Sequence, residues 1–284
     1  MPRDLGGLTD LLSREGFVSA EEEAQELLAC AAGDGERLEA LVARRLTGEP
    51  LAWVTGSTTF CGLDVRVDTG VYVPRWQSEQ LARRAVERLP ASGIAVDLCT
   101  GAGAIAATLK AERPGARVVA TDVDERAVAC ARANGVEVSL GDMFGPLPGG
   151  LEGRVDVVVA VVPYVPTPEL PLLQRDTFTF ETALAYDGGA DGTDVLRRVL
   201  ADATAFLRPG GAVLLELGGD QAEALSGDLE RLGYGDIRVL VDEDGDVRGI
   251  EATFKAPRRS RRSVRTCEAD GSLSHPSRTP RITS

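Results

Sequence analysis

The chain has 284 residues, enough for one large domain or two modest ones with an ample core. Hydrophobic residues make up 43% and charged residues 26%, as in ordinary soluble globular proteins. No apolar run approaches the ~20 residues of a membrane span, and the first residues lack the basic-then-apolar pattern of a signal peptide. We therefore expect a cytoplasmic protein with no membrane contact.

Cysteine and histidine usage narrows the chemistry. The five cysteines are scattered and form no Cys-x-x-Cys pair, so neither a zinc site nor a disulfide framework is indicated. The only histidine is His275, which argues against histidine base catalysis and histidine metal sites. We expect no metal, reduced thiols, and chemistry that depends on carboxylates, backbone groups and tyrosine.

The net charge of −13 is unevenly distributed along the chain. Residues 256–284 carry seven arginines against two acids, a balance of +5, so residues 1–255 carry −18. An acidic body argues against direct nucleic-acid binding by the folded part. The composition of 256–284, rich in Arg, Ser, Pro and Thr, predicts a disordered basic tail.

The first part of the chain is predicted to be helical, over residues 1–56. Ser19-Ala20-Glu21-Glu22 has the pattern of a capping box, and a second helix is expected from Glu36 to Leu46. Residues 57–76 follow as a hairpin linker, with short strands on either side of the Cys61-Gly62 turn. An amphipathic helix is then expected from Ser78 to Leu89.

From residue 77 to 255 the pattern becomes strand–helix–strand. Repeated β-α units of this kind form a mostly parallel sheet with helices on both faces. Two late strands, Ile237–Val241 and Arg248–Phe254, flank the turn 242–246 and are expected to pair antiparallel. The earlier strands are predicted near 94–97, 117–121, 136–140, 155–162 and 212–217.

A glycine turn follows the first of these strands. Asp97 ends the strand, and Thr100-Gly101-Ala102-Gly103 leads into the apolar helix that begins near Ile105. Glycines leave no Cβ to obstruct a ligand, and the start of a helix offers unpaired N–H groups. A strand–turn–helix of this type is typical of nucleotide-binding sites.

Acidic residues at the ends of two further strands help to distinguish between the classes of nucleotide that the site could bind. Asp122, followed by Val123, ends the second strand, where a carboxylate accepts hydrogen bonds from ribose hydroxyls. Asp142-Met143-Phe144 follows the third strand and is predicted to contact adenine through the acid and an apolar wall. Gly101 to Ala106 also satisfies the dinucleotide pattern, which stays as an alternative, but the order of acids favours S-adenosylmethionine (SAM).

The fourth strand ends at Val161-Val162-Pro163-Tyr164. In an open α/β sheet, ligands bind beyond the carboxyl ends of the strands, so this turn is expected beside the glycine turn, at the reactive end of the cofactor. The proline fixes the backbone, and the tyrosine offers an aromatic wall. We predict that these four residues form the catalytic site.

Several segments together resemble one known family. The chain is similar to the HemK/PrmC family, the SAM-dependent glutamine-N(5) methyltransferases of peptide-chain release factors, and most of all to its actinobacterial-type members. The similarity covers about residues 35–255. It is found in the linker 45–56, in Phe60-Cys61-Gly62-Leu63, in Val71 to Arg75 with Glu79, in Asp97 to Ala104, at Asp122, in Asp142-Met143-Phe144, and in Leu184 to Gly192.

The resemblance implies a class I SAM-dependent methyltransferase fold, Rossmann-like with a mostly parallel seven-stranded sheet, preceded by a small helical domain. It implies methylation of a glutamine side-chain amide in a release factor, at the Gly-Gly-Gln region. In the family, an Asn-Pro-Pro-Tyr motif orients that amide through the Asn oxygen and the next carbonyl. Here the Asn is replaced by Val161, which has no acceptor. A methyltransferase with a different acceptor, or a catalytically weak SAM-binding protein, therefore stay as alternatives.

Overall fold

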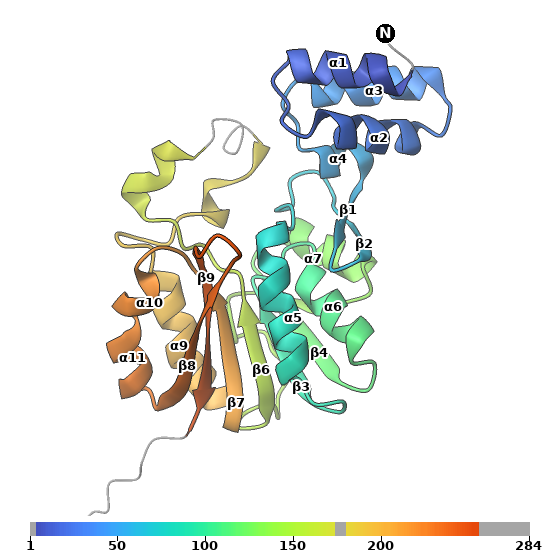
Figure 1. Ribbon diagram of the computed structural model, residues 1–284. Coiled ribbons are helices and arrows are strands. Elements are labelled where there is room, and N and C mark those ends of the chain that lie inside the picture. The colour runs from blue at the N-terminus through green and yellow to red at the C-terminus, as the bar shows by residue number, and fades with distance from the viewer. Residues whose placement is uncertain (1–3, 174–179, 256–284) are drawn as a thin grey trace, which may run out of the picture.

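The computed structural model describes residues 4–173 and 180–255 (Figure 1). A small helical domain precedes the sheet and has its own apolar core, which includes Leu8, Leu27, Val42 and Val54. Its helices are α1 (Leu5–Arg14), α2 (Ala20–Ala31), α3 (Gly35–Arg45) and α4 (Leu51–Thr55). In Figure 1 these helices lie at one end of the molecule, beyond the hairpin.

Aspartate caps explain where two of these helices begin. The Asp4 side chain accepts a hydrogen bond from the backbone N–H of Gly7, and Asp34 accepts from those of Glu36 and Arg37. The capping box expected at Ser19 is wrong. The Ser19 side chain makes no capping bond to any residue that the structure describes, although α2 does begin at the following residue.

The expected hairpin is present as β1 (Ser57–Phe60) and β2 (Leu63–Arg66), an antiparallel pair. Its turn residues Cys61 and Gly62 both have positive φ, as a two-residue hairpin turn requires. The backbone N–H of Cys61 donates to Glu79 Oε1 at 2.9 Å, which fastens the turn to the sheet domain. The acid that matches the family segment at position 79 therefore holds the hairpin in place.

Seven strands form the main sheet in the order β5-β4-β3-β6-β7-β9-β8. The five strands from β5 to β7 are parallel, and β9 pairs antiparallel with both β7 and β8. The predicted fold class is confirmed, including the antiparallel late pair. The strands are β3 (Ile94–Leu98), β4 (Arg117–Asp122), β5 (Glu137–Leu140), β6 (Val155–Ala160), β7 (Leu207–Glu216), β8 (Tyr234–Val241) and β9 (Val247–Phe254).

Helices cover both faces of this sheet, and each face has its own apolar core. One core includes Val157 and Leu214 from the sheet, and the other includes Val158 and Leu215, because side chains alternate along a strand. The helices and 3-10 turns are η1 (Trp76–Ser78), α5 (Glu79–Arg88), α6 (Ala104–Glu112), α7 (Glu125–Ala133), η2 (Thr167–Leu172), η3 (Ala183–Ala185), α9 (Asp194–Phe206), α10 (Gln221–Ala224) and α11 (Ser226–Arg231).

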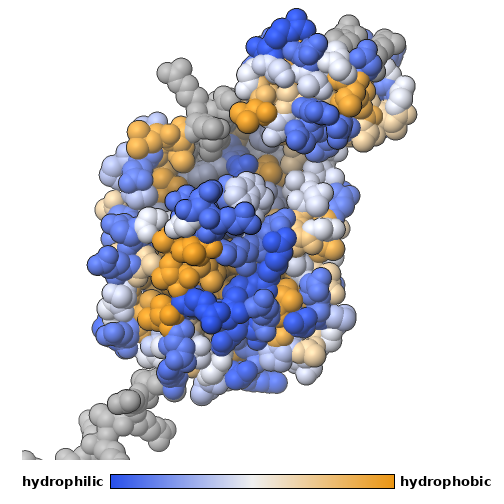
Figure 2. Space-filling view, viewed as in Figure 1, coloured by the Kyte–Doolittle hydropathy of each residue, from blue (hydrophilic) through white to orange (hydrophobic). Residues whose placement is uncertain are grey.

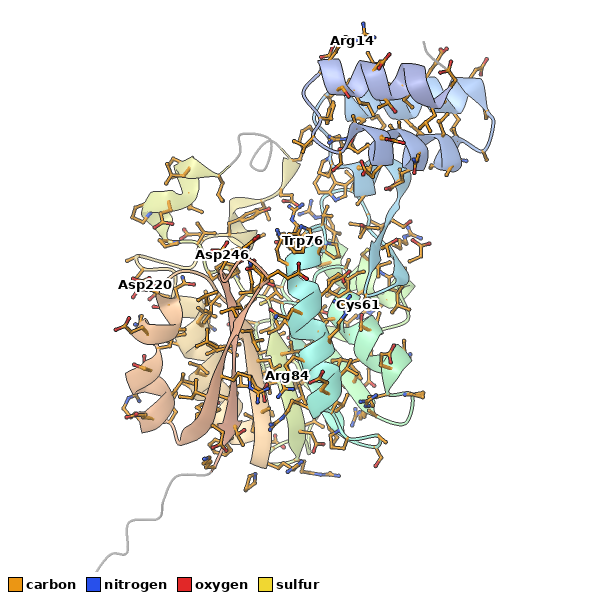
Figure 3. The ribbon with its side chains drawn as sticks, in the orientation of Figure 1. Arg14, Cys61, Trp76, Arg84, Asp220 and Asp246 are labelled. Carbon is orange, nitrogen blue, oxygen red and sulfur yellow. The ribbon has the colours of Figure 1, made fainter. Side chains whose placement is uncertain are left out.

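Charged side chains lie along α5, where Figure 2 shows a hydrophilic surface beside a hydrophobic patch and Figure 3 labels Arg84. Arg84 and Arg88 both pair with Glu251 of β9, which is buried. A buried carboxylate is tolerated only when such partners are present. These ion pairs fix α5 against the sheet and so fix η1, which lies at the carboxyl ends of the strands.

No helix in the two described ranges is long and apolar enough to cross a membrane. The division at residues 56 and 76 stays a prediction, since Ala52 and Trp53 of α4 pack in the core of the sheet domain. The expected basic tail at 256–284 lies outside the described residues.

Truncation after Lys255 should leave the melting temperature unchanged. The last strand is complete at Phe254, and the Lys255 side chain forms an ion pair with Asp236 at 2.7 Å. Residues 256–284 contain too few apolar residues for their burial to offset the entropy cost of ordering them. Calorimetry of the full chain and the truncated chain tests this, and a clear drop would show that 256–284 contributes to folding.

Candidate active site

A pocket opens at the carboxyl ends of β3, β4 and β6, the place that the sheet topology predicts. Figure 1 shows η2 and η3 at the same end of the sheet, toward the helical domain. The glycine turn lines one part of the pocket, and the turn after β6 lines another. Its lining includes Tyr72, Arg75, Asp97, Thr100, Gly101, Ala102, Asp122, Val123, Val161, Val162, Pro163, Tyr164, Glu181 and Tyr186.

Asp97 holds the glycine turn from below. Its Oδ2 accepts hydrogen bonds from the Thr100 hydroxyl at 2.6 Å and from the Ala106 N–H at 3.1 Å. The side chain is 2% exposed, and this burial raises the pKa of the Asp97 carboxyl to about 7. The predicted cofactor-site residue therefore sits under the loop and joins its two ends.

Asp122 holds the same turn from the neighbouring strand. Its Oδ2 accepts from the Gly101 N–H at 2.8 Å, and its Oδ1 accepts from the Asp124 N–H at 3.0 Å. Burial raises the pKa of this carboxyl as well. Each oxygen keeps a second lone pair, and the residue lines the pocket, so two further donors such as ribose hydroxyls fit here.

Glycine is required within the turn at two positions. Gly101 has φ +57°, and a Cβ there would meet nothing nearer than the Tyr72 carbonyl oxygen at 4.0 Å, so the space beside it is open to a ligand. Gly103 has φ +83° and packs so closely on Val136 and Ala131 that a Cβ would lie about 3 Å from each. Gly103 precedes α6 and is absent from the pocket lining, so it shapes the turn and does not border the pocket.

Cys99, which precedes both glycines in the chain, also lines the pocket, at φ +54°. Burial raises the pKa of its thiol to about 12. A thiol with so high a pKa is protonated at neutral pH and is a poor nucleophile. Covalent catalysis through Cys99 is therefore not what this geometry favours.

The third acidic turn, predicted to contact adenine, lies outside the pocket lining in this structure. Phe144, expected as an adenine wall, is buried and stacks on Phe206 with ring centroids 4.7 Å apart, so its ring belongs to the core. Met143 is buried in the same core. Asp142 is 61% exposed at its side chain and pairs with Arg198 at 2.6 Å. None of the three residues is part of the pocket lining. Met143 and Phe144 are buried in the core, and Asp142 pairs with Arg198 on the surface.

A polar cluster at the other end of the pocket was not predicted. Glu181 is buried and accepts hydrogen bonds from the Val73 N–H at 3.1 Å, from Arg75 at 2.7 Å and from the Tyr186 hydroxyl. Arg75 also lies over the Tyr72 ring, 5.2 Å from its centroid. The family-like segments at 71–75 and 184–192 hinted at these residues, but Glu181 lies outside both, and no local pattern marks it.

The segment that carries Glu181 also reaches the helical domain. Phe180 packs edge-on against Trp53 of α4, with centroids 6.3 Å apart, and the Trp53 indole N–H donates to the Val71 carbonyl at 2.8 Å. The two segments that border this end of the pocket are thus both fastened to one tryptophan of the helical domain.

Comparison with known proteins identifies the family. The profile of the methyltransferase small domain matches residues 68–144. The release factor glutamine methyltransferase of Geobacter sulfurreducens is 35% identical over 82% of this chain and 89% of its own length. Its counterpart in Moorella thermoacetica is 39% identical over 82% of this chain and 83% of its own, and that of Xylella fastidiosa is 34% identical over 90% and 99%.

The chain belongs to the release factor glutamine methyltransferase family. The recognition made from the sequence motifs is confirmed, and the sheet order is that of a class I methyltransferase. The cofactor of this methyltransferase is SAM, and the pocket fits it, since Asp122 has spare lone pairs beside an open glycine turn. The individual residue roles stay predictions.

Folding stability should respond to the titration of Asp97. Its pKa in the folded chain is above the ordinary value of about 3.9, so the folded state binds the proton more tightly. Its contribution to stability is therefore present below about pH 4 and is lost as the pH rises toward 7. Each pKa unit is worth about 1.4 kcal/mol, so the loss is on the order of a few kcal/mol.

Thermal unfolding of wild type and Asp97→Asn across this pH range measures the effect. The amide keeps an acceptor oxygen for Thr100 and Ala106 and does not titrate. The stability of wild type relative to the variant should fall between pH 4 and 7. A constant difference would contradict the raised pKa.

Asp122→Ala should weaken SAM binding at least tenfold. Hydrogen bonds from ribose hydroxyls to a carboxylate are worth about 1.5–3 kcal/mol each, and about 1.4 kcal/mol is a factor of ten in affinity. Asp142→Ala is the matched control, because that carboxylate lies outside the pocket lining and should matter much less. Calorimetric titration with SAM checks both variants, and an unchanged affinity in Asp122→Ala would refute the ribose role.

Proposed function

We propose that this chain methylates the side-chain amide nitrogen of a glutamine in a peptide-chain release factor, at its Gly-Gly-Gln region. The observation that supports this most directly is the convergence of two turns on one pocket. The glycine turn of the cofactor site and the Val161–Tyr164 turn line the same space at the carboxyl ends of neighbouring strands. The names of the relatives supply the substrate class.

The chemistry needs positioning more than acid–base catalysis. An amide nitrogen is a weak nucleophile because its lone pair is delocalised into the carbonyl, so it must be aimed at the methyl group. SAM supplies an activated methyl group when bound. The residues of this chain hold the acceptor: the Val162 carbonyl accepts an amide N–H, and the Tyr164 ring forms the adjoining wall.

Position 161 is the weak point of the acceptor site. A side-chain oxygen there would accept the second amide N–H, whereas Val161 presents only methyl groups. One amide N–H that loses its water without gaining an acceptor costs about 1–3 kcal/mol. We therefore propose slow transfer to glutamine in the wild type, with the carbonyl of Val162 keeping part of the orientation.

The reaction belongs in the cytoplasm, where release factors act on the ribosome. The acidic body of the chain would not favour contact with nucleic acid, so we propose that the folded part does not bind nucleic acid directly.

Mass spectrometry of a release factor after incubation with this protein and methyl-labelled SAM tests the function. The label should appear on the glutamine of the Gly-Gly-Gln segment. A release factor with Gln replaced by Glu at that position is the matched control, since it lacks the amide nitrogen. Bound SAM with no label on the glutamine would refute the proposal.

Val161→Asn should raise the rate of glutamine methylation by roughly five- to 150-fold, the range that corresponds to 1–3 kcal/mol of recovered orientation. SAM affinity should hardly change, because the substitution faces the acceptor. Val161→Leu, which adds no acceptor, serves as the control. If wild type is already fast, or if the Asn variant gains nothing while SAM still binds, Val161 is not the missing acceptor.

A further inference from the structure

A buried carboxylate lies behind the acceptor end of the pocket and has no part in the cofactor site. Glu216 is the last residue of β7 and is 4% exposed. Its Oε1 accepts a hydrogen bond from the Tyr164 hydroxyl at 3.0 Å. Its Oε2 makes no hydrogen bond of ordinary geometry among the residues that the structure describes, and only the buried Ser78 side chain interacts with this carboxylate beside Tyr164. An unpaired buried oxygen is costly, so this arrangement calls for an explanation.

Tyr164 is held from both ends. While its hydroxyl donates to Glu216, its backbone carbonyl accepts from Gln221 Nε2 at 2.7 Å. The glycine segment packs directly on the same residue. A Cβ at Gly192 would lie 2.2 Å from the Tyr164 carbonyl oxygen, and one at Gly188 would lie 2.7 Å from the Tyr164 Cα. The tyrosine is thus fixed in space by contacts from β7, α10 and the segment 188–192.

Glu216 is also the cross-strand neighbour of position 161. Strands β6 and β7 are parallel, and their last pair is Ala160 and Leu215, so continuing the register by one residue places Val161 opposite Glu216. Because side chains alternate, both lie on the sheet face of Leu214, whose core Val161 packs against. Neighbouring strands are about 4.8 Å apart, which is within reach of a side-chain hydrogen bond. Val161 has no donor to offer.

We propose that Glu216 is the positioning residue of the acceptor site. It holds the Tyr164 ring through the hydroxyl, and its second oxygen is matched to a donor from residue 161, which Val161 lacks. The inference rests on the proposed function only for its kinetic consequence. The structural part, that Glu216 fixes Tyr164 and is coupled to residue 161, is testable without any methyl transfer.

Fluorine NMR tests the first contact. The chain has four tyrosines, so 3-fluorotyrosine labelling gives four resonances, and Tyr164→Phe assigns one of them. Glu216→Leu should shift and broaden that resonance, and Glu216→Gln, which keeps an acceptor oxygen, should restore most of it. An unchanged Tyr164 resonance in a folded Glu216→Leu variant would overturn the proposal, whatever the enzyme does with glutamine.

A double-variant cycle on methyl transfer tests whether Glu216 acts through Tyr164. Glu216→Leu should lower kcat about tenfold, as expected for the loss of a hydrogen bond to a charged group, and leave the SAM Kd unchanged. Added to Tyr164→Phe, the same substitution should lower kcat no further. Equal losses in both backgrounds would overturn the proposal. Failure of wild type to label glutamine would instead refute the proposed function alone.

Thermal unfolding tests the coupling to residue 161. Val161→Thr replaces one methyl by a hydroxyl of similar shape, which can donate to the free oxygen of Glu216. The melting temperature should rise in the wild-type background and fall in the Glu216→Leu background, where the buried hydroxyl has lost its acceptor. The same change in both backgrounds would show that the two residues are not coupled.

Discussion

Two carboxylates at the ends of adjacent strands hold the glycine turn in its shape, and the rest of the site depends on that turn. Asp97 accepts from both ends of the turn, and Asp122 accepts from its middle at Gly101. Buried acceptors of this kind replace the water that an exposed loop would use. Gly101 leaves the space beside the turn open, so that a ligand can approach the backbone there.

The acceptor end is built by a different principle. There the chain brings together segments that are more than a hundred residues apart, and hydrogen bonds from Val73 and Arg75 to Glu181 join them. Trp53 extends the connection into the helical domain through Val71 and Phe180. A protein substrate that contacts the helical domain would therefore touch elements that also border the pocket.

Tyr164 lies between the cofactor turn and the acceptor end of the pocket. It follows β6, the strand between β3 and β7. Its hydroxyl donates to the buried Glu216, and its carbonyl accepts from the buried Gln221. The close packing of Gly188 and Gly192 on it gives a physical reason for the glycines of a segment that resembles the family. In the proposals made above, the departure at Val161 removes a partner both from the substrate amide and from the carboxylate of Glu216.

The sequence by itself determined the parallel sheet, the glycine turn, its acids and the turn after β6, because each is a local pattern of strand, glycine and acid. It was wrong about Ser19 as a cap, and it did not anticipate that Phe144, expected as an adenine wall, packs in the core. Both side chains look suited to those roles locally, yet Phe144 is buried against Phe206, a partner that no local pattern names.

Only the tertiary structure determined which groups hydrogen-bond to the buried carboxylates. Glu181 and Glu216 stand in ordinary sequence surroundings, and their roles depend on which distant groups face them. Residues 161 and 216 directly follow Ala160 and Leu215, which are paired only through the register of two strands separated by a long connection. Local sequence preference determines where a strand ends, but long-range packing determines which side chains contact one another there. The acceptor end of the pocket consists of such long-range contacts.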